Sequence, residues 1–350
     1  MARYRIAIIG TGGIAHYHAD YYVAHPATDL VAGADINPDS LKAFCDRFAV
    51  PARYEDYREL LDRERPDLVS VCTWQGTHSE ITMAAAEAGV KGIISEKPMS
   101  EDLASADAMI AACESRGIPL AVHHQTRSRP ACAAARQAIA EGRIGQPLAV
   151  IGRTGGGLMN CGSHVIDIAR YVLGDPACTW VLGQAERTTN RHERGSQVED
   201  LCAAIVGAGN GARIIIECDL AEGEKGSNPV AIGTEGMIVI GYAGSSIICG
   251  KGDSWQVLDE PPQPGFLEEF IIWLEGGPEH RCSARQARAS QEIMMALYES
   301  CRTRRLVHLP LGKGTSPLLE MIADGTMAVP DKPRYDIRSE AALRYCFPEG

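Results

Sequence analysis

Residues 4–15 read YRIAIIGTGGIA, and the fold class follows from this stretch. The apolar and β-branched residues 4–9 predict a buried parallel strand that ends at glycines. Gly10 to Ala15 fit the pattern G-x-G-x-x-G/A, and a helix is expected over residues 14–24. In such a strand–turn–helix unit the first glycine permits the tight turn and the second admits a pyrophosphate to the backbone. A small third residue lets the helix pack on the strand.

Asp35 follows a second predicted strand, residues 30–34, at the position where a carboxylate binds ribose hydroxyls in dinucleotide sites. Its charge would repel a 2′-phosphate, and no Arg or Lys follows at Ile36 or Asn37, so NAD is favoured over NADP. The N–H groups that begin the first helix would face the phosphates. A tight turn without a ligand is the alternative for the glycines alone. The cofactor contacts predicted here are Gly10, Thr11, Gly12, Gly13, Ile14 and Asp35.

Strands and helices alternate through residue 122, and this order predicts a doubly wound parallel sheet with helices on both faces. We therefore expect an NAD(P)-binding Rossmann domain over residues 1–122, in an α/β protein. The further elements expected in it are helices over 39–48, 79–88 and 103–115, and strands over 68–72, 92–95 and 119–122.

The pattern changes after residue 122, where strands separated by turn glycines predominate. Neighbouring strands of this kind predict a largely antiparallel sheet. We expect a second α/β domain over residues 123–350 that binds substrate and mediates oligomerisation. Its expected helices are 131–141, 163–173 and 283–302, and its expected strands are 147–153, 179–185, 201–206, 213–218, 230–233, 237–240, 246–249 and 307–309.

The composition excludes several other classes of protein. A net charge of −11 would repel a nucleic-acid backbone, and no apolar run reaches the roughly 18–20 residues of a membrane span. None of the 12 cysteines forms a C-x-x-C pair, and we interpret them as reduced core thiols of a cytoplasmic protein. His123 and His124 suggest a metal, but no third ligand has helpful spacing, so no metal site is predicted.

Glu96-Lys97-Pro98 closes the predicted strand over residues 92–95. In an open parallel sheet, the carboxyl ends of the strands face the ligand crevice, so Lys97 would point at the reactive end of the cofactor. A surface salt bridge at a turn is the alternative for an isolated Glu-Lys-Pro.

Further motifs accompany this turn in chain order. They are Thr73-Trp74-Gln75-Gly76-Thr77-His78, Ala88-Gly89, His124-Gln125-Thr126-Arg127 with Pro130, Gly155-Gly156-Gly157, Gly162-Ser163-His164-Val165-Ile166-Asp167, Val198-Glu199-Asp200 and Gly233-Thr234-Glu235-Gly236. Together, over residues 4 to 240, they resemble the Gfo/Idh/MocA oxidoreductases, which include inositol, glucose-fructose and sugar-nucleotide dehydrogenases. Trp74 departs from the proline usual in that family. Asn160 stands where many members carry an Asp.

The resemblance implies an NAD-dependent dehydrogenase that acts on a hydroxyl carbon of a sugar, cyclitol, glycoside or sugar nucleotide. It also implies an open-faced second sheet that pairs in homodimers or homotetramers. A redox-neutral lyase or glycosidase that uses bound NAD transiently is one alternative, and a catalytically silent NAD-binding regulator is another. Further cofactor contacts implied by the resemblance are Thr73, Trp74, His78, Glu96, Lys97 and Gln125.

The resemblance also implies that Lys97 and His164 both reach the reacting oxygen. Alcohol oxidation sends a hydride to nicotinamide and a proton to a base, and the ordinary pKa of histidine, near 6.5, suits His164 for that role. Lys97 would then orient and polarise the oxygen, although the reverse assignment remains open. Asn160 would hydrogen-bond substrate or cap the following helix. Asp167 would bind substrate, orient His164 or serve a structural role.

Overall fold

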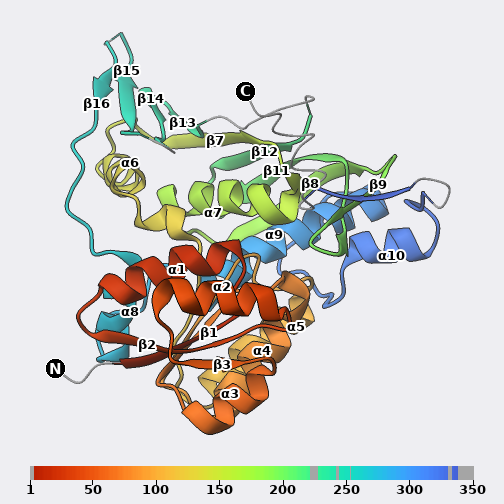
Figure 1. Cartoon of the computed structure of the whole chain (residues 1–350). Coiled ribbons are helices and arrows are strands. Elements are labelled where there is room, and N and C mark those ends of the chain that lie inside the picture. Colours follow the sequence, from red (N-terminus) through yellow and green to blue (C-terminus); the bar gives the residue numbers. More distant parts are fainter. Residues whose placement is uncertain (1–3, 221–227, 242–243, 253, 330–332, 338–350) are drawn as a thin grey trace, which may run out of the picture. The chain divides into compact units, whose positions relative to one another are not determined.

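The computed structural model describes residues 4–220, 228–241, 244–252, 254–329 and 333–337 (Figure 1). The chain divides into two compact units. The first contains residues 1–123 and 264–287, and the second contains residues 124–263 and 288–350. The predicted boundary after residue 122 lies next to the point, between residues 123 and 124, where the chain first passes from one unit to the other. The segment 264–287, which was predicted to belong to the second domain, packs with the first unit instead.

The first unit is built on a six-stranded parallel sheet in the order β3-β2-β1-β4-β5-β6. This order confirms the predicted doubly wound sheet. Its strands are β1 (Tyr4–Ile9), β2 (Thr28–Ala34), β3 (Ala52–Tyr54), β4 (Leu68–Val71), β5 (Gly92–Ser95) and β6 (Leu120–Val122). Its helices are α1 (Gly13–Ala24), α2 (Pro38–Phe48), α3 (Tyr57–Glu64), α4 (Gln75–Glu87), α5 (Leu103–Glu114) and α8 (Phe266–Leu274).

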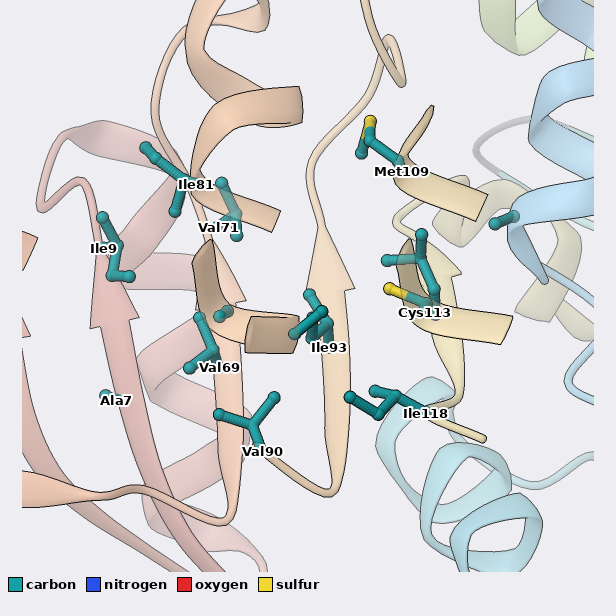
Figure 2. Packing of buried hydrophobic residues seen from close by; sticks show 14 of the residues in the cluster. Ala7, Ile9, Val69, Val71, Ile81, Val90, Ile93, Met109, Cys113 and Ile118 are labelled. Atoms are coloured by element: carbon teal, nitrogen blue, oxygen red, sulfur yellow. The ribbon is translucent and has the colours of Figure 1, made fainter. Parts of the chain in front are cut away.

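Apolar side chains cover both faces of this sheet, because successive residues of a strand point to opposite sides. Ala7 and Ile9 belong to a cluster with residues of α3, α4 and α5, part of which Figure 2 shows. Ile6 and Ile8 belong to a second cluster with residues of α1, α2 and α8. The unbroken apolar run of residues 4–9 therefore reflects a strand buried on both sides.

Helix α8 explains why segment 264–287 belongs to the first unit. Phe270 is fully buried in the cluster on the α1 side of the sheet. A side chain at Gly92 would lie 2.8 Å from Leu274 and 3.0 Å from the Phe270 ring. The absence of a side chain at Gly92, the first residue of β5, thus leaves room for α8. The residues in contact are about 180 positions apart in the chain, so local sequence patterns do not reveal this packing.

The second unit contains a nine-stranded sheet in the order β16-β15-β14-β13-β7-β12-β11-β8-β17. Only the β7–β12 pair is parallel among these neighbours, so the prediction of a largely antiparallel sheet is confirmed. The strands are β7 (Pro147–Thr154), β8 (Cys178–Glu186), β11 (Leu201–Ala208), β12 (Arg213–Cys218), β13 (Val230–Gly233), β14 (Gly236–Val239), β15 (Ile247–Gly250), β16 (Gln256–Val257) and β17 (Val307–His308).

Helices pack against one face of this sheet. A side chain at Gly152 of β7 would meet Val165 of α7 (Ser163–Val172), and one at Gly183 of β8 would meet Leu297 of α9 (Ala284–Thr303). The remaining helices are α6 (Pro130–Ala140), α10 (Pro317–Ala323), the 3₁₀ turn η1 (Gln125–Ser128) and the π turn η2 (Gly157–Gly162). A small sheet joins β10 (Ser196–Gln197), β9 (Asn190–Glu193) and β18 (Arg334–Asp336). No helix among the described residues is long and apolar enough to cross a membrane.

Candidate active site

The glycine turn between β1 and α1 has the geometry that its sequence predicts. Gly10 has a φ of +87°, and a Cβ there would lie 2.7 Å from backbone atoms of Cys72 and Thr73, so only glycine fits. At Gly12 and Gly13, by contrast, an added Cβ would meet no protein atom within 4 Å. The packing of the protein does not itself require glycine at these two positions, and the space beside them suits a ligand that approaches the backbone.

The start of α1 offers an anion site beside that space. Gly12 is the N-cap residue, no side chain caps the helix, and its first turn carries no acidic residue. The exposed N–H groups and positive end of a helix bind phosphate. These features fit the pyrophosphate of a dinucleotide.

Asp35 fixes the glycine turn from the end of β2. Its Oδ2 accepts hydrogen bonds from the Thr11 N–H at 2.7 Å and the Thr11 hydroxyl at 3.0 Å, and its Oδ1 accepts from the Asn37 N–H at 2.8 Å. Ile36 beside it is 91% exposed. The carboxylate therefore lies at the rim of the turn, with apolar Ile36 beside it where a 2′-phosphate would need a cation.

The residues predicted to surround the rest of the cofactor lie in the loops that follow strands and in the first turns of the helices after them. Trp74, between β4 and α4, is 60% exposed. His78 is buried, with Nδ1 2.9 Å from the Pro98 carbonyl and Nε2 3.0 Å from the Thr73 carbonyl, so it links this loop to the turn that carries Lys97. In the second unit, Gln125 begins η1, and its buried Oε1 has no hydrogen-bond partner among the described residues. Such a buried acceptor suits a ligand amide.

Lys97 follows Glu96 directly after β5, as predicted. The Lys97 N–H donates to Oε2 of Glu96 at 3.1 Å, and the Glu96 side chain is buried. The other carboxylate oxygen of Glu96 faces His18 and His123 within the first unit. These contacts favour a positioning role for Glu96, whereas its predicted contact with the cofactor stays a prediction.

His164 lies in the first turn of α7 and is half-buried. Its Nδ1 is 3.5 Å from the Thr126 hydroxyl, and its ring meets the His124 ring edge-on at 5.7 Å between centroids. The preceding π turn carries Asn160, which is buried. The N-cap of α7 is Gly162, without a side-chain cap, and the Asn160 amide donates instead to the Gly156 carbonyl at 3.4 Å. The capping interpretation of Asn160 is therefore wrong.

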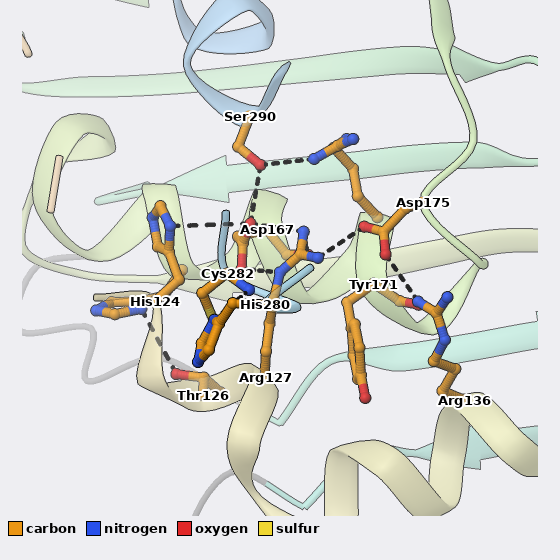
Figure 3. A network of polar contacts seen from close by, with 12 residues as sticks. His124, Thr126, Arg127, Arg136, Asp167, Tyr171, Asp175, His280, Cys282 and Ser290 are labelled. Carbon is orange, nitrogen blue, oxygen red and sulfur yellow. Dashed lines mark hydrogen bonds and ion pairs between the residues drawn. The ribbon is translucent and has the colours of Figure 1, made fainter. Parts of the chain in front are cut away.

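Asp167 is the centre of a buried ion-pair network (Figure 3). Arg127 donates to both of its carboxylate oxygens, at 2.6 and 2.7 Å, and the Ser290 hydroxyl donates at 3.0 Å. Arg127 also pairs with Asp175 at 2.9 Å. Burial opposes ionisation of Asp167, but the positive charge of Arg127 outweighs it and holds the pKa of this carboxyl far below its ordinary value. These contacts favour the structural alternative for Asp167, and a catalytic role stays a prediction.

Two further carboxylates hold the segment that carries Asn160 and His164. Asp219 accepts the N–H groups of Gly156 and Gly157, both at 2.7 Å. Glu199 accepts the Leu158 N–H at 2.8 Å and the Tyr298 hydroxyl at 2.5 Å. Val198-Glu199-Asp200 is recognisable in the sequence as a motif, but its role is not, because the partners of Glu199 are 41 and 99 residues away.

Residues 4–124 match the family model GFO_IDH_MocA, described as an oxidoreductase family with an NAD-binding Rossmann fold, and residues 151–239 match the GFO/IDH/MocA C-terminal domain. The chain belongs to the Gfo/Idh/MocA oxidoreductase family. This result confirms the predicted resemblance. The cofactor of this Gfo/Idh/MocA oxidoreductase is NAD, in agreement with the glycine turn and Asp35.

Several relatives match three quarters or more of the chain. The D-apiose dehydrogenase of Paraburkholderia graminis is 25% identical, over 93% of this chain and 95% of the relative. The scyllo-inositol 2-dehydrogenase (NAD(+)) of Bacillus subtilis is 28% identical, over 77% of this chain and 84% of the relative. A solved structure of levoglucosan dehydrogenase with NADH and levoglucosan has a TM-score of 0.77 at 24% identity, over 88% of this chain and 100% of that one. That structure shows a shared fold.

Gly12→Ala tests the cofactor site. The new methyl group meets no protein atom, so stability should change by about 1 kcal/mol or less, whereas NAD affinity should fall about tenfold or more because the pyrophosphate needs that space. Calorimetric titration with NAD and a thermal melt measure the two effects. Gly265→Ala at the N-cap of α8, where φ is −63° and an added Cβ also meets no protein atom, is the matched control for affinity. Unchanged NAD affinity in Gly12→Ala would contradict the assignment.

Asp167→Asn tests the ion-pair network. The substitution leaves Arg127 buried with less compensation, so the free energy of unfolding at pH 7 should fall by about 3–5 kcal/mol. The folded pKa of Asp167 lies below the unfolded value of about 3.9, so its stabilisation is present above that pH and is lost as pH falls. Denaturant titrations from pH 7 to pH 3 should show a shallower decline in the variant. The exposed Asp259→Asn should keep the wild-type slope, and an equal slope in Asp167→Asn would contradict this account.

Proposed function

We propose that this protein oxidises a hydroxyl-bearing carbon of a small polyhydroxylated molecule, a sugar, cyclitol, glycoside or sugar nucleotide, with NAD as the hydride acceptor. The observation that carries the proposal is the retention of Lys97 and His164 in a member of this family with an intact glycine turn. The dehydrogenases of apiose and scyllo-inositol among its relatives support this substrate class.

In the proposed mechanism, His164 accepts the hydroxyl proton and Lys97 orients and polarises the oxygen, with the reverse assignment still open. Bound NAD supplies the electrophilic ring that takes the hydride. The partial exposure of His164 leaves its ring accessible to substrate. Asn160 cannot titrate, so it would hydrogen-bond a substrate hydroxyl. Asp167 would act from the interior, since its contacts with Arg127 and Ser290 hold the helix that carries His164.

We also propose that two or four copies assemble through the nine-stranded sheet. Leu182 and Ile205 are cross-strand partners and are 47% and 41% exposed, and Ile205 is also paired with the half-buried Ile215. Adjacent exposed aliphatic side chains on one sheet face are typical of a protein interface. A cytoplasmic location remains part of the proposal, supported by the burial of many cysteine thiols in the core.

Lys97→Ala and His164→Ala test the chemistry. Purified enzyme would be incubated with NAD or NADP and a panel of sugars, inositols, glycosides and sugar nucleotides, and the reduced-nicotinamide absorbance followed. Each variant should lose about 100-fold or more in kcat because a proton-transfer or polarising group is gone, while NAD affinity stays nearly unchanged. The exposed Lys42→Ala and His308→Ala are matched controls. Wild-type turnover in both active-site variants would contradict the proposed chemistry.

Leu182→Lys combined with Ile205→Lys tests the assembly. Two buried ammonium groups at an interface are costly, so the variant should be monomeric in light scattering coupled to size exclusion. Val23→Lys, at a 55% exposed position of α1, is the control. A wild-type protein that is itself monomeric would refute the proposed assembly, and a variant that keeps the oligomeric wild-type mass would place the interface elsewhere.

A further inference from the structure

Three ionisable side chains meet in the interior of the first unit. His18 comes from α1, Glu96 follows β5, and His123 follows β6. Oε1 of Glu96 is 2.9 Å from His18 Nε2 and 2.7 Å from His123 Nδ1, and these two nitrogens are 3.1 Å apart. The three side chains are 0%, 6% and 1% exposed. We call them the His–Glu–His cluster.

The hydrogen bonds of the cluster compete for the same three atoms, Glu96 Oε1, His18 Nε2 and His123 Nδ1. Each nitrogen lies within hydrogen-bond distance of the same oxygen and of the other nitrogen, so the two cannot both direct an N–H at each other. His18 Nδ1 faces the Ser70 hydroxyl at 2.8 Å, and the buried Nε2 of His123 has no hydrogen-bond partner among the described residues. Nδ1 is therefore the ring nitrogen of His123 that can donate within the cluster, where it lies close to both Glu96 and His18.

The surroundings keep Glu96 charged. Burial opposes its ionisation, but the hydrogen bonds from His123 and His18 outweigh burial and hold the pKa of Glu96 well below its ordinary value. Burial also opposes a charge on His18, yet neighbouring Cys72 and Glu96 raise the pKa of His18 overall, against the effect of His123. Tyr21 and Tyr22 pack beside the cluster and keep raised pKa values, so they stay neutral.

The same carboxylate fixes the backbone of Lys97. Oε2 of Glu96 accepts the Lys97 N–H at 3.1 Å, the Glu96 N–H donates to the Val71 carbonyl at 2.8 Å, and the His123 N–H donates to the Ser95 carbonyl at 2.8 Å. His18 lies in the helix that begins at the glycine turn. The cluster therefore links the cofactor-binding helix to the turn that carries Lys97.

We propose that His18, Glu96 and His123 are positioning residues that hold Lys97 in place and set the pH at which its ammonium group loses its proton. The anionic carboxylate one peptide away favours the charged form of Lys97, and a positive charge on His18 offsets that effect. The proposal rests on the role of Lys97 in the proposed function.

Hydrogen bonds account for the spacing of the cluster better than a metal ion does. Two imidazole nitrogens and a carboxylate oxygen are also ligands that zinc accepts. Ligands about 2.0–2.1 Å from a tetrahedral metal are about 3.3 Å apart, whereas these atoms are 2.7 to 3.1 Å apart. A metal bound by these three side chains would therefore contradict the hydrogen-bonded arrangement.

Competitive acetylation of the full-length protein across a pH series, read by mass spectrometry, measures the pKa of Lys97 without a known substrate. Glu96→Gln should lower that pKa by about half a unit or more, because the adjacent negative charge is gone. His18→Gln and His123→Asn place an amide nitrogen where Nε2 and Nδ1 stood, and they should not lower it. His280→Gln, a buried histidine of the same unit bonded to the Phe266 carbonyl, is the control.

Turnover supplies the second readout. His18→Ala and His123→Ala should lower kcat about tenfold with little change in KM, and the amide variants should restore most of it, because they keep the donor atoms that hold Glu96. NAD binding and a thermal melt confirm that each variant is folded. An unchanged Lys97 pKa in a folded Glu96→Gln protein overturns the proposal.

Stoichiometric metal in the purified protein, lost in Glu96→Gln, also overturns it. Failure of the proposed function is a separate result, namely full turnover in Lys97→Ala, since the acetylation measurement does not depend on catalysis.

Discussion

The turn at Gly10 is the constraint on which the first unit depends. Its backbone passes so close to Cys72 and Thr73 that any side chain would clash, and this closeness lets β1 lead directly into α1. The start of α1 and the carboxylate of Asp35 are thereby held in one place, since Asp35 bonds Thr11 within the turn. A single missing side chain thus decides where phosphate and ribose can bind.

In the second unit, buried charged side chains fix the backbone of the candidate site, as the tight turn at Gly10 does in the first unit. The Arg127–Asp167 pair joins η1 to α7, and Glu199 and Asp219 accept hydrogen bonds from N–H groups of the turn that precedes α7. Buried ion pairs are weak contributors to net stability, because desolvation opposes their attraction. Their value here is geometric, since they fix the backbone from which Asn160 and His164 project.

The sequence predicted those helices and strands that are marked by features of neighbouring residues, such as apolar runs and glycines. The strand–turn–helix at Gly10 and the strand before Lys97 were found because apolar runs and glycines mark them. Helix α3 was missed because only Leu60 and Leu61 are buried along it. The placement of α8 against Gly92 and the meeting of Glu96 with His18 depend on contacts across 78 residues or more, and no local pattern encodes these. The capping interpretation of Asn160 failed because this residue lies within the π turn η2, and the N-cap position of α7 belongs to Gly162.

The return of residues 264–287 to the first unit has a consequence for synthesis on the ribosome. When residue 123 has been made, all six strands of the parallel sheet exist, but the apolar surface around Ile94 and Ala121 still lacks Phe266 and Phe270. More than a hundred further residues must therefore be synthesised before Phe266 and Phe270 can cover this part of the sheet. For the same reason, no single cut in the gene yields two self-sufficient halves, and a fragment ending at residue 123 is an aggregation hazard rather than a domain.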